Sequence, residues 1–187
     1  MKADDWLLVH SAAGGWEQFV TRWSTMKGAR VIGSTGSAAK VKTAQAADAA
    51  EVFLHTDAAW AEKVREIADS REVHIAIDGT GGFMLASTFS VVCPFGIVAS
   101  LGQSAGPIPP VRVEELGFAR SIALIQPSSI AYADDADLYR QGAEDLMQAF
   151  QNGLENPVGA EYTLTDAAKA HSDLEAGRTT GSVILTV

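Results

Sequence analysis

Short runs of β-branched and aliphatic residues alternate with stretches of helical periodicity along almost the whole chain. The runs at residues 6–10, 29–33, 51–54, 74–78, 96–101 and 121–125 are typical of buried strands. Helical patterns at residues 16–26, 37–46, 58–68, 83–92 and 136–151 lie between or after them. Because strands joined by helices run parallel through right-handed crossovers, this order predicts an α/β fold with a doubly wound, six-stranded parallel sheet flanked by helices.

The signals after the last long helix indicate a boundary. Asn152-Gly153 and Pro157 interrupt the helical pattern, so we expect a first domain over residues 1–152 and a C-terminal segment over residues 153–187. That segment combines a short strand, a helix that begins near Thr165, and a last strand at residues 182–187. The sequence therefore predicts a helix–strand appendage on the main domain.

Charge and composition exclude some classes of partner. The 187 residues carry 14 Lys and Arg against 23 Asp and Glu, a formal net charge of −9, which argues against binding nucleic acid. The apolar stretches are too short to span a bilayer and none follows a basic start, so we expect neither a membrane partner nor a secretory signal. Cys93 is the single cysteine, and a cytoplasmic protein is the expectation.

The turn after the first strand carries the first functional signal. Its residues Ala12-Ala13-Gly14-Gly15-Trp16-Glu17 take the places of the G-x-G-x-x-G fingerprint with which Rossmann-type sheets bind a dinucleotide. Backbone N–H groups at such a helix start face a pyrophosphate, and the helix dipole favours its charge. Only the middle glycine is kept, so the turn alone is a weak indication.

A longer string is more specific. Residues 2–15 read K-A-D-D-W-L-L-V-H-S-A-A-G-G, which resembles the K-P-G-D-x-V-L-V-H-A-A-A-G-G-V-G opening of the quinone oxidoreductases. These form the zeta-crystallin-like, zinc-free branch of the medium-chain dehydrogenase/reductase superfamily. The resemblance continues at residues 28–33, 77–82, 100–110, 166–171 and 177–185, in order and over nearly the whole chain.

The resemblance implies a domain that binds NADPH and passes hydride to a quinone or enone. No protein nucleophile is needed for that chemistry, so we nominate no catalytic acid or base. Residues 34–37 after the second strand contain no acid to hold a ribose 2′-hydroxyl, which favours the phosphorylated cofactor. By match to the family, the cofactor-binding residues are Ala12, Ala13, Gly14 and Gly15 at the pyrophosphate, Ser34 and Lys40 at the 2′-phosphate, His55 in the groove, and Gly102 and Gln103 at the nicotinamide.

Several of these residues have a plainer interpretation. Lys40 can be a solvated helix residue, His55 can lie in an exposed loop, and Gly102-Gln103 can form an ordinary strand-end turn. His10 is expected to be a packed core histidine, and His74 and His171 to be structural or solvated. No His and Cys residues have the spacing of metal ligands, so the sequence predicts no metal site.

Glu17 is the main departure from the fingerprint, because it stands where the third glycine belongs and follows Trp16. A carboxylate 4 Å from a phosphate charge is repelled by at most about 4 kcal/mol at an effective dielectric of 20, or about three decades in affinity. The alternative is a helix-start Glu that the dipole favours. We predict that Glu17→Gly tightens NADPH binding, and a titration without that gain would contradict the first interpretation.

Two further expectations follow from the resemblance. In the family a β-barrel substrate domain precedes the first strand, and residues 153–187 return to pack on it; the printed sequence starts at that strand. We therefore expect an open nicotinamide side. Residues 121–126 form the expected edge strand, and family members pair such edges, which predicts a homodimer. Two rival hypotheses are a non-catalytic remnant that folds and dimerises without turnover and no longer binds nucleotide, and a dinucleotide sensor that binds NADPH without turnover.

Overall fold

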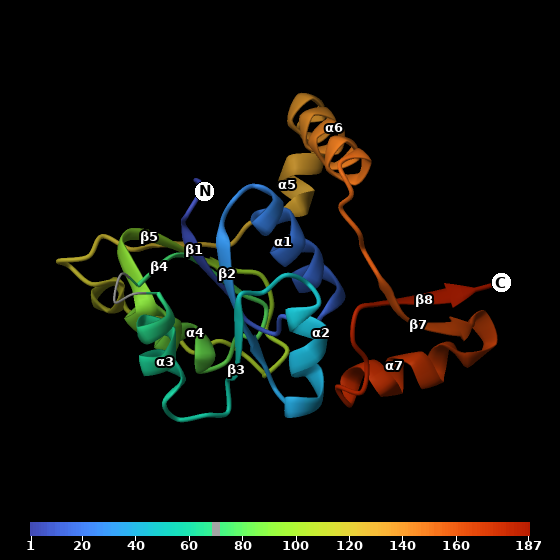
Figure 1. Cartoon of the computed structure of the whole chain (residues 1–187), viewed down its shortest axis with the longest axis horizontal. Helices are drawn as coiled ribbons and strands as arrows, with labels where there is room; N and C mark the ends of the chain where they lie inside the picture. Colours follow the sequence, from blue (N-terminus) through green and yellow to red (C-terminus); the bar gives the residue numbers. More distant parts are fainter. Residues whose placement is uncertain (69–71) are drawn as a thin grey trace.

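A single six-stranded parallel sheet organises the main part of the molecule (Figure 1). The computed structural model describes residues 1–68 and 72–187. Its strands follow the order β3-β2-β1-β4-β5-β6, so the chain first winds outward from β1 to β3 and then returns to β4 on the other side of β1. The predicted doubly wound α/β fold is confirmed.

The strands of this sheet match the predicted runs closely. They are β1 (Trp6–Val9), β2 (Arg30–Thr35), β3 (Glu51–Leu54), β4 (Val73–Asp78), β5 (Val92–Ser100) and β6 (Ala123–Ile125). Between or after them lie α1 (Gly15–Met26), η1 (Ala38–Lys40), α2 (Val41–Gln45), α3 (Trp60–Ile67), α4 (Met84–Thr88), η2 (Phe89–Val91), η3 (Val113–Leu116), α5 (Ser129–Ala133) and α6 (Ala136–Gln151).

Two apolar layers hold helices against the two faces of the sheet. Leu8 and Ile32 point toward α3, where they pack with Trp60 and Val64. Leu7 and Val31, one position earlier on the same two strands, point to the opposite face. Because neighbouring strand residues point to opposite faces, both faces of β1 are apolar and all four of its residues are buried. Figure 1 shows the result, with α1 and α2 on one face and α3 and α4 on the other.

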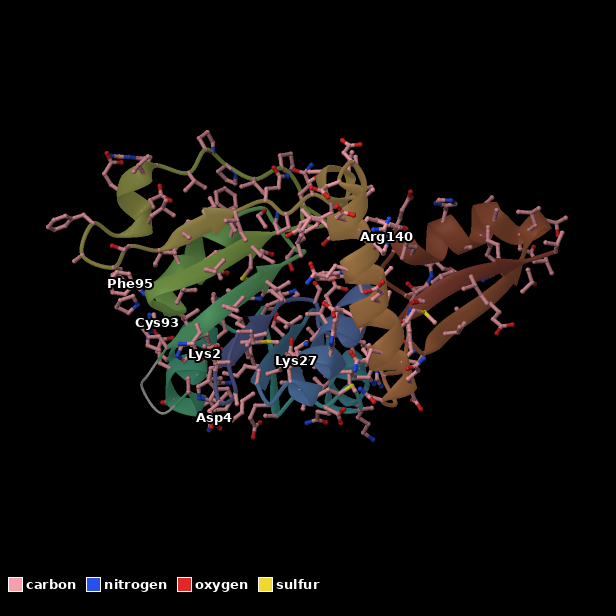
Figure 2. All side chains as sticks on the ribbon, turned by 90° about the horizontal axis from the view of Figure 1, so that it is seen from above. Lys2, Asp4, Lys27, Cys93, Phe95 and Arg140 are labelled. Carbon is pink, nitrogen blue, oxygen red and sulfur yellow. The ribbon has the colours of Figure 1, made fainter. Side chains whose placement is uncertain are left out.

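Helices α5 and α6 continue the chain beyond β6, and residues of both line a groove together with the start of α1. Phe150 of α6 contacts Phe19 of α1, with ring centroids 6.0 Å apart. Cys93 and Phe95, near the start of β5, lie at the end of the sheet away from α6, which carries Arg140 (Figure 2). Among the residues that the structure describes, no helix is long and apolar enough to cross a bilayer.

The C-terminal segment forms a small unit beside α1 and α2 (Figure 1). It consists of β7 (Val158–Thr163), η4 (Leu164–Asp166), α7 (Ala167–Glu175) and β8 (Ser182–Thr186), with β7 and β8 paired in parallel. The Asp173 carboxylate accepts hydrogen bonds from Tyr162, Lys169 and Arg178, which ties α7 to β7 and to the following turn. The segment contacts the main domain at the start of α1, where a bridge joins Gly14 and Gly181.

Three details of the chain differ from the sequence patterns. Residues 83–92 are not one helix, because a 3₁₀ turn over Phe89–Val91 leads into β5 at Val92. Strand β5 therefore starts four residues before the predicted position, at an irregular stretch in which Phe95 has a φ of 64°. The short helix α5 was not predicted, and the Ser128 side chain caps its start by accepting from Ala131 N–H.

Candidate functional site

The turn between β1 and α1 lies at the carboxyl end of the sheet, beside the point where the strand order reverses between β1 and β4. Gly14 is the N-cap of α1 in an extended conformation, and no side chain caps the helix. Two hydrogen bonds fix the backbone of the turn. Ala12 N–H donates to Ser34 O at 2.8 Å, and the Gln18 side chain donates to Ala13 O at 2.9 Å. A helix start of this kind presents backbone N–H groups to an anion.

Small residues allow the turn to approach its neighbours. A Cβ on Gly33 would lie 2.9 Å from the Cβ of Ala12, so the glycine in β2 makes room for the alanine that stands first in the fingerprint. A Cβ on Gly15 would lie 2.8 Å from the backbone nitrogen of Ser182. Gly181 N–H donates to Ala13 O at 3.0 Å, so the C-terminal segment forms one wall of the turn.

A small hollow of about 330 Å³ opens at this turn. It is lined by Ser11, Ala13, Gly14, Gly15, Glu17, Thr35, Gly36, Lys40, Gly79, Ser104, Leu174, Gly177, Thr179 and Gly181. The structure thus brings Ala13, Gly14, Gly15 and Lys40, all named from the sequence, to one place. The hollow extends from the start of α1 to the segment after β2, where it is lined by Lys40, whose ammonium group can bind an anion.

His55 lies at the far side of the same strand ends. It follows β3, and its Nε2 atom lies against Gly36, because a Cβ on that glycine would be 3.3 Å away. Its Nδ1 atom is buried and has no hydrogen-bond partner among the described residues. Burial lowers the pKa of His55, and the charge of Asp78 acts in the opposite direction. His55 is therefore half-buried, and its Nδ1 atom has no hydrogen-bond partner among the described residues.

The hydroxyl of Ser34 is in the core rather than in the hollow. It lies 2.8 Å from His10 Nδ1, and the other ring nitrogen of His10 lies 2.9 Å from Thr88 Oγ1. Thr88 donates its own proton to Met84 O, so it accepts from His10 Nε2 and leaves Nδ1 to accept from Ser34. Burial, with a smaller contribution from His55, lowers the pKa of His10 to about 3. Ser34 and Ala12 are both fully buried.

A large groove of about 860 Å³ continues from the small hollow toward α5 and α6. Glu17 and Gly79 line both spaces, and the groove is mainly apolar. Its lining residues are Trp16, Glu17, Gly79, Leu101, Gly102, Pro127, Ser128, Ser129, Tyr132, Leu138, Tyr139, Gly142, Ala143 and Leu146. Gly102 is thus in the groove wall, whereas Gln103 is exposed beside Gly81.

Glu17 lies at the junction of the two spaces. Its carboxyl group fills the position where a Cβ on Gly14 would be, and its Oε1 atom would lie 2.8 Å from a Cβ on Gly79. The carboxyl is wedged between the α1 turn and the residue that follows β4. Burial raises the pKa of Glu17, and its own backbone N–H partly offsets that effect. The side chain is directed into the site from the first turn of α1, a position compatible with both interpretations from the sequence.

Asp78, at the end of β4, is a residue whose role the sequence analysis did not identify. Its Oδ1 atom accepts from the backbone N–H of Thr80 at 2.7 Å and of Gly81 at 3.0 Å. Its Oδ2 atom is buried without a partner among the described residues, and burial raises its pKa. An acid followed by Gly-Thr-Gly-Gly at a strand end is the signal that could have identified this turn.

The remaining histidines lie outside the groove. His74 Nδ1 accepts from Trp6 N–H at 3.1 Å, and its Nε2 atom lies 3.7 Å from an Asp5 oxygen. His171 is exposed on α7. Across residues 1–68 and 72–187, no group of three or more His, Cys, Asp or Glu residues could hold a metal ion.

Comparison with families of known proteins gives a match over most of the chain. Residues 47–185 match the family model described as zinc-binding dehydrogenase. The residues that the structure describes do not offer the ligands for the metal in that description. The residue types at the groove suit a nucleotide better, since glycines, an ammonium group and an apolar wall lie together.

Individual relatives extend this match to the ends of the chain. A quinone oxidoreductase of Pseudomonas aeruginosa is 28% identical over 99% of this chain, and a 2-haloacrylate reductase of a Burkholderia species is 30% identical over 99%. A mycobacterial structure in complex with NADPH superimposes on the whole chain with a TM-score of 0.93 and 34% identity. The chain spans 56–58% of the length of these three proteins.

Proposed function

Because the chain belongs to the zinc-binding dehydrogenase family, within the medium-chain dehydrogenases and reductases, we propose that it is the cofactor-binding part of an NADPH-dependent quinone or enone oxidoreductase. One observation carries the proposal. The small hollow, with the start of α1 on one side and Lys40 on the other, adjoins the apolar large groove at Glu17 and Gly79, which line both. Both lie at the carboxyl end of the sheet near the strand reversal, which is where such sheets bind dinucleotides.

Each part of the cofactor has a counterpart in these spaces. Gly14, Gly15 and the backbone of Ala12 and Ala13 are proposed to hold the diphosphate at the start of α1. Lys40 and His55 are proposed to contact the 2′-phosphate, while Ser34 supports the end of β2 from the core through His10. Gly102 and Gln103 are proposed for the nicotinamide end, beside the Gly79 turn.

The chain's own contribution is positioning. NADPH, when bound, supplies the hydride that reduces the acceptor. The large groove offers Trp16, Tyr132, Tyr139 and aliphatic side chains, a surface suited to a flat apolar acceptor such as a quinone. Because no titratable group of the groove is required to attack the acceptor, orientation and exclusion of water are the roles left to these residues.

Lys40 provides the decisive test. Lys40→Gln removes the charge that distinguishes NADPH from NADH, so NADPH affinity measured by calorimetry should fall about tenfold or more while NADH affinity stays unchanged. Lys42→Gln is the matched control, because Lys42 is exposed on the next turn and does not line the small hollow. Failure of the folded protein to bind either cofactor would overturn the proposal.

A second candidate is a dinucleotide-fold protein that dimerises without turnover. The observation in its favour is the Glu17 carboxyl group, which lies over Gly14 where the diphosphate is proposed to bind. The two candidates separate in one assay. Quinone-dependent loss of the reduced-nicotinamide absorbance supports the reductase, absence of cofactor binding supports the second candidate, and cofactor binding without that loss supports a sensor.

We also propose a homodimer formed through the edge of the sheet. Strand β6 ends the strand order, Ile125 is 43% exposed, and Phe118 before it is fully exposed. An unpaired apolar edge favours pairing with a second copy. Light scattering at micromolar concentration should give a dimer that Ile125→Lys dissociates and Ile130→Lys, on α5, does not. A monomeric wild type would contradict this arrangement.

The compartment is a separate proposal. We propose the cytoplasm, and the presence of a single cysteine in the sequence supports it.

A further inference from the structure

We propose that the Glu17 carboxyl group occupies the diphosphate position in the free protein, so that a dinucleotide binds only after this group takes up a proton or turns away. The inference rests on the proposed function and concerns a property of this chain rather than of the fold. It makes Glu17 a residue that determines which ligands the groove accepts.

The contacts of the carboxyl group define the obstruction. One oxygen lies over the α carbon of Gly14, and the other faces the α carbon of Gly79 across the groove. Gly14 is the N-cap of α1, so this is the surface to which the helix start presents its N–H groups. Among the residues that the structure describes, Glu17 and Gly79 alone line both the small hollow and the large groove. The carboxyl group therefore divides one continuous path into two compartments.

The division separates two kinds of ligand. A nucleotide that carries only a 2′-phosphate needs the compartment of Lys40 and Gly36, with His55 against Gly36, and the carboxyl group leaves this compartment open. A dinucleotide must pass its diphosphate between Gly14 and Gly79 to reach the large groove. The first ligand can bind beside an ionised Glu17, whereas the second is repelled by it.

The protonation state of Glu17 then controls dinucleotide binding. Burial raises the pKa of this carboxyl above its ordinary value, which favours the neutral form as the pH falls. A neutral carboxyl does not repel a phosphate and can donate a hydrogen bond to it. We therefore expect dinucleotide binding to take up a proton and to strengthen toward acid pH.

Other titratable groups face the same path, so their effects on the pH dependence of binding must be distinguished from that of Glu17. Lys40 lines the small hollow and His55 lies against Gly36 beside it, Tyr132 and Tyr139 line the large groove, and Asp78 lies behind the Gly79 turn. His55 and the 2′-phosphate of the ligand also titrate toward acid pH. The ligand 2′-AMP shares both of these titrations and lacks the diphosphate, which makes it the internal control.

The experiment compares two ligands on the folded chain. NADP⁺, which tolerates acid better than NADPH, and 2′-AMP are titrated by calorimetry from about pH 5.5 to about pH 8, in buffers of different ionisation enthalpy. We expect NADP⁺ affinity to fall at least tenfold more than 2′-AMP affinity across this range, with extra proton uptake of up to one proton for NADP⁺.

Variants assign the effect to one side chain. Glu17→Gln keeps the shape and removes the charge, so it should raise NADP⁺ affinity at about pH 8 by about 10- to 100-fold and abolish the extra proton uptake. Glu17→Gly should do the same and also reopen the space over Gly14. The matched control is Glu62→Gln, because Glu62 is also an acid in the first turn of its helix, α3, and is exposed.

The outcomes separate this inference from the proposed function. Tight NADP⁺ binding by the wild type, with the same affinity and proton uptake in Glu17→Gln, overturns the role of Glu17 and leaves the proposed function standing. Absence of binding of both NADP⁺ and 2′-AMP in the wild type and in both Glu17 variants overturns the proposed function itself. An equal effect of Glu62→Gln would show a general charge effect and also overturn the inference.

Discussion

The hydroxyl group of Ser34 lies 2.8 Å from the buried Nδ1 atom of His10, and this pair joins the carboxyl ends of β1 and β2 beneath the small hollow. Ser34 belongs to the stretch that the sequence assigns to the 2′-phosphate. Its hydroxyl instead satisfies a histidine that has no access to water. The strand ends that form the hollow are thus fixed by a polar contact inside the core.

Removing this contact should destabilise the protein without changing its choice of cofactor. Ser34→Ala leaves a buried imidazole nitrogen without a partner, which should lower the free energy of unfolding by about 1–3 kcal/mol in urea titrations. The ratio of NADP⁺ to NAD⁺ affinity should stay the same. Ser37→Ala is the control, because Ser37 is exposed and caps nothing with its side chain, and should change stability by less than about 0.5 kcal/mol. A fall in the affinity ratio for Ser34→Ala would instead support direct contact with the 2′-phosphate.

His10 should make stability depend on pH in a defined direction. Its pKa is about 3 in the folded chain against an ordinary 6.5, so the unfolded chain binds a proton that the folded chain does not. The free energy of unfolding should fall as the pH drops below about 6.5, by up to about 1.4 kcal/mol per pH unit. Urea titrations at several pH values measure this slope.

Substitution separates the contribution of His10 to the pH dependence of stability from the contributions of nearby acids. The raised pKa values of Glu17 and Asp78 act in the opposite direction, because the folded chain holds protons on them that the unfolded chain has released. His10→Gln should remove the His10 slope and leave theirs. Equal profiles for the wild type and His10→Gln would contradict the burial of a neutral imidazole.

Asp78 should stabilise the turn after β4 through its acceptor atom rather than its charge. Asp78→Ala leaves the N–H groups of Thr80 and Gly81 unpaired, which should cost about 1–3 kcal/mol of unfolding free energy. Asp78→Asn keeps an acceptor oxygen and should recover most of that loss in thermal or urea unfolding. If Asn were as destabilising as Ala, the negative charge would have to be the stabilising feature.

Two glycines of the second half of the chain should respond oppositely to alanine. A Cβ on Gly159 would overlap the carbonyl oxygen of Thr180, so Gly159→Ala should force β7 from its neighbour and cost about 1–3 kcal/mol. A Cβ on Gly142, inside α6, meets nothing within 4 Å, so Gly142→Ala should stabilise by about 0.5–1 kcal/mol. Hydrogen exchange should localise the first loss to β7 and β8, and uniform exchange across the sheet would contradict it.

The fold could be predicted where local pattern and burial agree. Each of the six strands coincides with an apolar run, and α6 occupies residues 136–151 as its periodicity predicts. The start of β5 could not be predicted, because Pro94 and the left-handed Phe95 interrupt the pattern while pairing with β4 still extends to Val92. Helix α5 is too short for its period to stand out from a loop.

For the candidate site, the sequence could predict which backbone positions lie close together but not where the side chains point. Residue order places Gly14, Gly15 and Lys40 near one another, because the carboxyl ends of β1 and β2 are neighbours. The direction of a side chain depends on contacts that spacing does not encode. Ser34 turns inward because His10 needs a donor, and Glu17 turns toward Gly79, which lies 62 positions further along the chain.

The contact between Gly14 and Gly181 sets an order of events during synthesis. The loop before α1 leaves the ribosome early, but the wall formed by Thr179 and Gly181 emerges only after every strand of the main sheet has been made. A nascent chain can therefore assemble its sheet before it can enclose a nucleotide. At the proposed cofactor site, the complete wall of the hollow is therefore available only once translation has passed residue 181.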